Sequence, residues 1–229
     1  MNLSAVTSPT VNDDSNSGYA VGSVWIDVIG KEAYVLVDSA PGSAFWRLVT
    51  HNYEIGDLGP AGGLVFYITD GGLSGLEAAP VDQLTSADSA TAVWCGVTSE
   101  IAGADGTAIG TGAANTADII AGCAEADIAA KIADTYSLNG HNDWYLPSLE
   151  ELHLMWENLA DTDGDNANTG PGDPNNLGGF VAGYYWSSSE SSSNNANTVY
   201  FSVSGGDPDD KRKLGGKSSA LSVRAVRAF

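Results

Sequence analysis

The sequence predicts an α+β fold, and the prediction rests on three observations. Short apolar runs rich in β-branched and aromatic residues come first, two segments with helical periodicity follow, and further strand-like runs close the chain. The second helical segment opens with a capping box, in which Glu151 follows Ser148 by three residues. Strands, then helices, then strands are typical of helices packed on an antiparallel sheet.

The first 52 residues predict a polar arm and a small β-rich module. Residues 1–20 are rich in Asp, Asn and Ser and predict a flexible arm. The module, over residues 21–52, has three predicted strands, at residues 24–29, 33–38 and 44–50. A three-stranded unit is marginally stable by itself, so we expect it to serve attachment or oligomerisation.

Residues 53–229 predict one larger domain. Its expected strands are apolar runs at residues 64–68, 76–80, 184–186, 198–203 and 222–229. The Gly/Ala/Thr-rich residues 95–115 predict a long ordered loop. The expected helices span residues 116–136, capped by Asn115 or Thr116, and the residues that follow the capping box at Ser148.

The composition excludes several classes of partner. The chain carries 29 acidic and 9 basic residues, a formal net charge of −20. Residues 1–200 hold 26 acidic and three basic side chains, whereas residues 201–229 hold three acidic and six basic ones. An acidic body repels phosphate backbones and anionic lipids, so we expect no nucleic-acid partner and no membrane insertion. No run approaches the ~20 apolar residues of a membrane span, and the N-terminus lacks the features of a signal peptide.

No residue pattern points to catalysis. The three histidines, His51, His141 and His153, lie far apart and lack metal-ligand spacing. The serines around Ser188 lack the Gly-x-Ser-x-Gly frame of a nucleophile elbow. Carboxylate pairs such as Glu150 and Glu151 lie on one helix turn and are more typical of a solvated face than of an acid/base pair. We therefore expect that the protein is not an enzyme.

One acidic segment is a candidate calcium site. Asp161, Asp163 and Asp165 alternate in a turn-forming stretch, and this spacing lets carboxylate oxygens converge on Ca²⁺. The EF-hand pattern fails at Asn166 and Gly172, so the ligand set is incomplete. The alternative, an acidic solvated loop, is favoured for that reason. We expect no cofactor besides this candidate structural calcium.

Cys95 and Cys123 are the only two cysteines of the chain. They can form one disulfide, which would tie the long loop to the first helix, or remain two buried thiols. Neither has a basic neighbour to stabilise a thiolate, which argues against a reactive pair. The disulfide is the favoured alternative.

The C-terminal part of the chain combines strands with polar segments. Tyr184, Tyr185, Trp186 and Tyr200 stand beside residues 191–197, a run of Ser and Asn with one Ala. Aromatic anchors among short hydrogen-bonding side chains are typical of a binding surface on rigid strands. Composition alone leaves open the alternative of a flexible solvated loop.

Five motifs in order carry a resemblance to a known family. They lie at residues 62–67, 76–80, 143–152, 185–190 and 223–229. Together they resemble the C-type-lectin-like family of bacterial surface and phage proteins (the Lcl C-terminal domain), over about residues 53–229. The family includes ligand-binding variable proteins of diversity-generating retroelements and phage tropism determinants. The resemblance implies a C-type lectin fold, with two helices and antiparallel strands.

The resemblance also implies where a ligand binds. In the variable proteins, scattered positions near the C-terminus are diversified while their flanks stay fixed, and the matching window here is residues 191–221. With the aromatic Tyr184 beside it, the candidate ligand-binding residues are Tyr184, Ser192, Ser193, Asn194, Asn197, Thr198, Tyr200, Ser202, Asp207, Asp209, Asp210, Arg212 and Lys213. We expect residues 191–213 to be exposed. The residues expected to be buried are Trp144, Trp186, Val223 and Val226.

Residues 8–19, 21–23 and 25–27 resemble segments that recur in phage tail-fibre and structural proteins. The two resemblances together imply a non-enzymatic receptor-binding protein in a phage or prophage virion tail, which binds a host-surface protein or glycan and contacts other tail proteins. A homotrimer would add avidity. The alternatives are a bacterial cell-surface adhesin and a purely structural virion module. A formylglycine-generating type of enzyme is the weaker alternative, because no cysteine follows Cys123.

Overall fold

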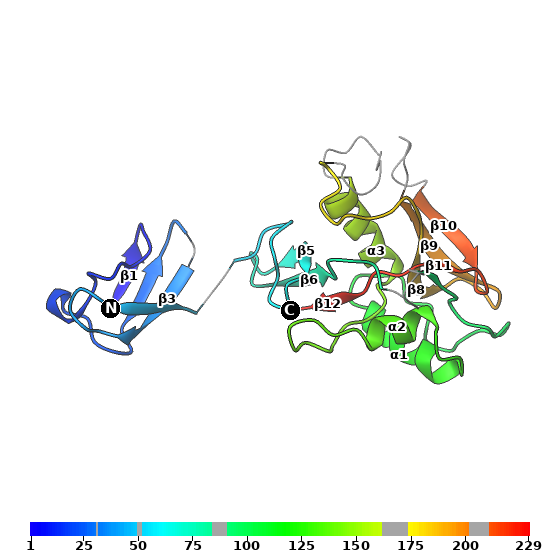
Figure 1. Cartoon of the computed structure of the whole chain (residues 1–229), viewed down its shortest axis with the longest axis horizontal. Coiled ribbons are helices and arrows are strands. Elements are labelled where there is room, and N and C mark those ends of the chain that lie inside the picture. The colour runs from blue at the N-terminus through cyan, green and yellow to red at the C-terminus, as the bar shows by residue number, and fades with distance from the viewer. Residues whose placement is uncertain (31, 50–51, 84–90, 162–173, 202–210) are drawn as a thin grey trace. The chain divides into compact units, whose positions relative to one another are not determined.

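The computed structural model of the chain describes residues 1–229 except residues 31, 50–51, 84–90, 162–173 and 202–210 (Figure 1). The described residues form two compact units. The first comprises residues 1–54 with residues 68–74, and the second comprises residues 55–67 with residues 75–229. Both units contain β-structure, and the α-helices of the described chain lie in the second.

A four-stranded sheet forms the first unit. Its strands, in spatial order, are β1 (Asn2–Ala5), β2 (Val24–Asp27), β3 (Glu32–Asp38) and β4 (Phe45–Leu48). β1 runs parallel to β2, and the other neighbours are antiparallel. The last three strands lie where the apolar runs predict them. β1 falls in the predicted flexible arm and corrects that prediction.

The N-terminal segment is held by tryptophans of the sheet. The Trp25 indole donates a hydrogen bond to the carbonyl of Thr7 (2.8 Å), and the Trp46 indole donates to that of Asp13 (2.9 Å). The Tyr19 ring packs against both indoles, with centroid distances of 5.7 and 5.4 Å. The polar composition of this segment does not predict its docking, because the anchoring groups belong to β2 and β4.

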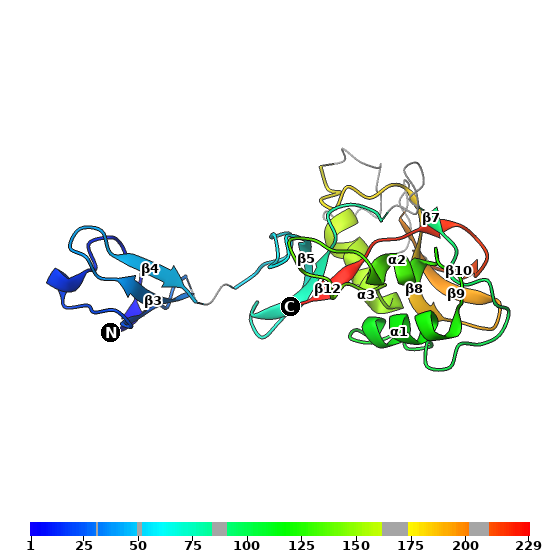
Figure 2. The ribbon, with the colours of Figure 1, turned by 60° about the horizontal axis from the view of Figure 1, so that its bottom comes forward.

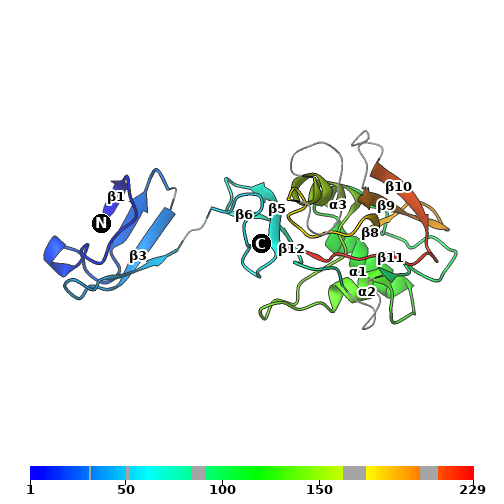
Figure 3. The ribbon, with the colours of Figure 1, turned by 45° about the horizontal axis from the view of Figure 1, so that its top comes forward.

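The second unit contains two sheets. The larger has the order β10-β9-β8-β11-β7, and its strands are β7 (Thr91–Ala92), β8 (Gly183–Glu190), β9 (Asn195–Phe201), β10 (Arg212–Gly216) and β11 (Leu221–Ser222). The smaller has the order β12-β6-β5, with β5 (Leu64–Thr69), β6 (Ser74–Ala78) and β12 (Val226–Ala228). β10 is therefore an edge of the larger sheet (Figure 3).

Two strands of the larger sheet differ from the prediction. β9 begins at Asn195, inside the Ser/Asn run, and β10 lies in a Gly/Asp/Lys-rich segment that predicts no strand. Cross-strand pairing, such as Lys213 with Thr198, holds both segments extended. Pairing of this kind satisfies backbone groups whatever the side chains are, so composition gives no signal for it.

Three α-helices lie in the described part of the chain: α1 (Gly112–Gly122), α2 (Ala129–Asp134) and α3 (Leu149–Met155). α1 and α2 replace the single helix predicted over residues 116–136, so that prediction is wrong. α1 ends because Cys123 has an extended backbone, with φ −116° and ψ 121°. The Lys131 ammonium of α2 then donates to the carbonyls of Cys123 (2.9 Å) and Glu125 (2.6 Å), which stabilises the connection.

α3 begins where the sequence predicts it. The Ser148 amide donates to the Glu151 carboxylate (2.8 Å), and the Glu151 amide donates to the Ser148 hydroxyl (3.3 Å), so the predicted capping box is confirmed. Glu151 is fully buried, so the prediction of a solvated face is wrong for this carboxylate, to which the Gly110 amide also donates (2.8 Å). The helix continues as a π-helical turn, Trp156–Ala160. None of the described helices has the length and apolar character needed to span a bilayer.

The core of the second unit lies on both sides of the larger sheet. α1 packs against β8, and α3 packs against β8 and β9 (Figure 2). The residues expected to be buried are confirmed, since each is at most 1% exposed: Trp144, Trp186, Val223 and Val226. Sheets with helices packed against them place the fold in the α+β class.

Candidate ligand-binding surface

Buried serine side chains fix the β8–β9 hairpin. Ser187, Ser188 and Ser189 are fully buried. The Ser189 hydroxyl donates to the carbonyl of Gly106 (2.6 Å), and the Asn115 amide donates to the Ser188 hydroxyl (3.2 Å). Buried hydroxyls with satisfied hydrogen bonds hold a defined geometry. The serine run is therefore part of the scaffold, and none of its hydroxyls faces solvent.

A buried ion pair supports the turn between β8 and β9. The Lys217 ammonium contacts the Glu190 carboxylate, and the two side chains are 3% and 5% exposed. The Ile101 amide donates to the same carboxylate (2.9 Å), and Lys217 also donates to the carbonyl of Ser99 (2.9 Å). Additional hydrogen bonds of this kind compensate the desolvation of buried charges. The turn therefore has a fixed base.

The inner face of the sheet packs against α3. Tyr185, Val199 and Phe201 are fully buried there. Arg212 pairs with Val199 across β10 and β9 and so points to the same face. Its guanidinium forms an ion pair with Glu150 of α3 (2.7 Å). Arg212 thus contacts the scaffold rather than the outer face.

The opposite face, called the outer face here, carries the alternate side chains of the same strands, and at Trp186 it packs into the core on the side of α1. Tyr184 pairs with Tyr200, and Trp186 pairs with Thr198. Tyr184 is 41% exposed and Tyr200 is half-buried, whereas Trp186 and Thr198 are fully buried. The Trp186 indole extends over Gly215 of β10, where a Cβ would come within 2.7 Å of the ring. Of the two pairs, only Tyr184 and Tyr200 are accessible to a ligand.

The accessible candidates gather at two ends of the hairpin. The tyrosine end consists of Tyr184, Tyr200 and Lys213. The turn end consists of Ser192, Ser193 and Asn194. Tyr200 and Asn194 are six positions apart, which is about 20 Å along an extended strand. A small ligand can therefore contact one end only, whereas a large ligand can span both.

Several candidates lie differently from the expectation. The prediction that residues 191–213 are exposed is wrong at five buried positions, Ala196, Thr198, Val199, Phe201 and Lys211. Val199 and Phe201 face α3, whereas Thr198 lies on the opposite face against its cross-strand partner Trp186. Asn197 donates to the main-chain carbonyl of Ser189 (3.0 Å) and supports the irregular end of β8. Four candidates lie outside the described residues: Ser202, Asp207, Asp209 and Asp210.

The candidate calcium ligands are described only in part. Asp161 follows the π-helical turn and is 4% exposed. Asp163 and Asp165 lie outside the described residues. Within the described part of the chain, the side chains that could hold a metal ion form one group, Cys95, Cys123 and Glu125, whose ligand atoms lie within 4.8 Å of one another.

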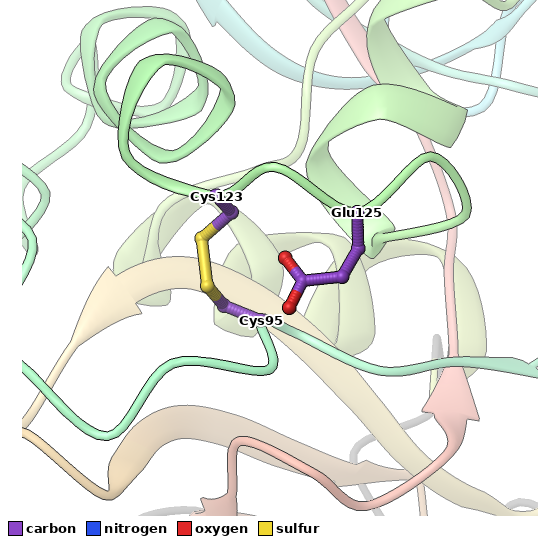
Figure 4. Close-up of side chains that lie close together, drawn as sticks. All are labelled: Cys95, Cys123 and Glu125. Carbon is purple, nitrogen blue, oxygen red and sulfur yellow. A yellow bond between two sulfur atoms is a disulfide. The ribbon is translucent and has the colours of Figure 1, made fainter.

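Cys95 and Cys123 are joined in that group by a disulfide, with a Cα–Cα distance of 5.9 Å. Of the two alternatives that the sequence leaves open, the structure thus contains the covalent one. Figure 4 shows the Glu125 carboxylate facing the two sulfur atoms. Sulfurs that are bonded to each other are not thiolates and hold no metal. The disulfide ties the loop after β7 to the end of α1.

A cavity of about 810 Å³ beside α2 is lined by none of the candidate ligand-binding residues. Asp82 in its wall pairs with Arg224 (2.6 Å) and accepts a hydrogen bond from the Tyr185 hydroxyl (2.8 Å). The Lys131 ammonium in its wall is bound to main-chain carbonyls. The buried charges of this cavity are therefore satisfied within the protein.

The part of the chain that bears this surface matches a known protein family. A family model described as the Lcl C-terminal domain matches residues 85–227. The chain belongs to the Lcl C-terminal domain family. The resemblance carried by the sequence motifs is thereby confirmed. No curated protein matches the chain.

The matched range contains the whole candidate surface. The Lcl C-terminal domain begins just before β7 and ends within β12, so it carries the five-stranded sheet and the helices α1, α2 and α3. The first unit and the strands β5 and β6 precede the match. The tyrosine end, the turn end and the buried ion pair below the turn therefore all belong to this domain.

Two residues that shape the surface, Glu190 and Gly215, are not among the predicted site residues, although the sequence gives an indication of the role of each. Glu190 ends the Trp-Ser-Ser-Ser-Glu run, and a carboxylate that closes a buried run needs a cationic partner, which Lys217 supplies. Gly215 lies within a strand, where glycine often marks the close approach of another group, here the Trp186 indole.

Proposed function

We propose that the Lcl C-terminal domain of this chain is a non-enzymatic ligand-binding domain of the C-type lectin fold, whose β8–β9 hairpin and edge strand β10 bear a binding surface that tolerates diversification. One observation carries the proposal: the accessible candidates lie at the ends of a hairpin whose residues 187–190 are buried and hydrogen-bonded to the rest of the domain. A surface of this kind can change its exposed side chains without losing its framework.

The proposal extends to the setting in which the domain works. The ligand is a molecule on a bacterial host surface, and the chain is carried in the tail of a phage or prophage. The first unit attaches the chain to other tail proteins or assembles it into a homotrimer. Assembly supports this function because weak single-site contacts become effective when several act together.

Adsorption of the purified protein to a panel of bacterial strains tests the proposal. The test variant changes four side chains for which the described part of the chain gives no hydrogen bond: Tyr184→Ala, Ser193→Ala, Asn194→Ala and Tyr200→Ala. The control variant changes two exposed residues at α2, Asp134→Ala and Ser137→Ala. Selective adsorption that the test variant loses and the control keeps supports the proposal. Equal adsorption of both variants, or no adsorption by the native protein, contradicts it.

A further inference from the structure

The tyrosine end presents an unusual pair of rings. Tyr184 and Tyr200 stand side by side on neighbouring strands, with a centroid distance of 4.6 Å and an interplanar angle of 36°. Tyr184 is 41% exposed and Tyr200 is half-buried. Neither hydroxyl has a hydrogen-bond partner among the described residues. The pair thus differs from the neighbouring Tyr185, which points to the opposite face, is fully buried and donates its hydroxyl to Asp82.

The chemistry of two adjacent rings limits what they bind. Aromatic faces carry negative charge density, and they attract C–H groups that carry partial positive charge. The apolar face of a pyranose ring presents such C–H groups in one plane, and its hydroxyls point outward to solvent or to hydrogen-bonding side chains. A rigid pair of tyrosines supplies this contact at small entropic cost, because each ring has two rotatable bonds.

The charge of the chain limits the ligand further. Residues 201–229 hold six basic side chains, and at least four of these pair with carboxylates among the described residues: Arg212 with Glu150, Lys217 with Glu190, Arg224 with Asp82, and Arg227 with Glu77 and Asp143. The net field of the domain therefore remains acidic, and it repels polyanionic polysaccharides. The same field leaves an uncharged sugar unaffected.

We infer that Tyr184 and Tyr200 form a stacking platform for a neutral hexopyranose of a bacterial surface polysaccharide. The inference rests on the proposed function, since it names the ligand of the same surface. A single platform of two rings gives weak binding to one sugar unit, and strong adsorption needs repeated units bound by several copies of the chain. The buried pair Trp186 and Thr198 lies beside the tyrosines on the same face of the hairpin.

Saturation-transfer NMR with methyl hexopyranosides tests the platform directly. The native protein is titrated with the methyl glycosides of glucose, galactose and mannose, and with glucuronic acid as the anionic counterpart. We expect saturation of ring C–H protons for at least one neutral sugar and no binding of glucuronic acid. Tyr184→Ala and Tyr200→Ala should each weaken binding about fivefold or more, whereas Tyr184→Phe, which keeps the ring, should change it less than about twofold. Thermal unfolding establishes that each variant is folded.

The failure of this inference differs from the failure of the proposed function. If the protein adsorbs to cells, and if periodate oxidation of the cell glycans leaves adsorption intact while protease treatment removes it, the ligand is a protein and the inference is wrong, although the proposed function stands. No binding of any neutral sugar, or equal binding by the native protein and Tyr184→Ala, likewise overturns the inference. Absence of adsorption to every strain refutes the proposed function instead.

Discussion

Lys217 and Glu190 form a buried ion pair beneath the turn that bears part of the candidate surface. The ammonium lies 4.9 Å from the centroid of the Trp94 ring, which provides a cation–π contact in addition to the carboxylate. The pair joins β8 to the segment after β10, which are 27 residues apart in the sequence. The position of the turn therefore depends on two side chains that are almost fully buried.

Removing one partner of this pair should destabilise the domain strongly. Lys217→Met leaves the Glu190 carboxylate buried without its cation, and we expect a loss of about 3–5 kcal/mol in the free energy of unfolding. Urea unfolding measures it. The double variant Glu190→Gln with Lys217→Met removes both charges and should lose less than Lys217→Met. A single variant as stable as the native protein would show that the pair is not buried in solution.

Gly215 should resist the addition of a single methyl group. In Gly215→Ala the new Cβ would lie 2.7 Å from the Trp186 indole and 3.0 Å from the Thr198 methyl, both fully buried. Overpacking of this kind costs about 1–3 kcal/mol. Gly216→Ala is the matched control, because its nearest neighbour atom would be the Ser219 hydroxyl at 3.7 Å. Thermal unfolding of the two variants compares them, and equal stability would contradict the placement of the indole over β10.

The disulfide should contribute to stability through the loop that it closes. Cys95 and Cys123 are 28 residues apart, and a cross-link over such a loop contributes about 3–4 kcal/mol in the chain-entropy treatment. We expect the double variant Cys95→Ala with Cys123→Ala to lose about that much free energy of unfolding, and therefore to unfold at a lower urea concentration. Unfolding in the presence of dithiothreitol reduces the disulfide, so it should lower the urea midpoint of the native protein toward that of the variant. The urea midpoint of the variant should not change. A native protein with two titratable thiols would contradict the account.

Asp14 should make the first unit sensitive to acid. Hydrogen bonds from backbone amides, first that of Gly42 (2.6 Å), hold the pKa of the Asp14 carboxyl below its ordinary value of 3.8. A carboxylate with a lowered folded pKa contributes stability that is fully present above the unfolded pKa and is lost as the pH falls through the folded one. The indole N–H resonances of Trp25 and Trp46 in the full chain report on this unit, since both bind the N-terminal segment.

The variant Asp14→Asn checks the cause of that acid sensitivity. We expect it to weaken the first unit at pH 7 and to remove part of the loss between neutral and acid pH, because asparagine does not titrate. Identical pH profiles of the indole resonances in the two proteins would assign the acid sensitivity to other groups. Asp13 lies next to Asp14, and its carboxylate accepts a hydrogen bond from the Thr10 amide (2.7 Å), so Asp13→Asn provides the control.

The sequence predicts those parts of the fold that depend on local patterns. The capping box at Ser148 starts α3, because its two hydrogen bonds lie within four residues. The break between α1 and α2 could not be predicted, since it depends on the pairing of Cys123 with a cysteine 28 residues away and on Lys131. Periodicity continues across the break and indicates one helix.

The candidate surface could be predicted as a region but not residue by residue. The window from the Ser/Asn run to Lys213 does contain the accessible hairpin ends. Thr198 is buried because it pairs with the buried Trp186, and Asn197 differs because its amide donates to the main-chain carbonyl of Ser189. Both contacts depend on the register of β9, and the Ser/Asn run gives no hydrophobic alternation to set that register. Long-range pairing with β8 sets it instead.

Two display libraries of the full chain test the central claim most directly. The first randomises the accessible positions of the hairpin ends: Tyr184, Ser193, Asn194 and Tyr200. The second randomises four buried positions of the same hairpin: Trp186, Ser188, Ser189 and Glu190. The account predicts that most members of the first library remain protease-resistant and that selection on different bacterial strains yields members with new strain selectivity, while most members of the second unfold. A first library that folds but never changes selectivity, or a second that folds as often as the first, would contradict a variable binding surface on a fixed scaffold.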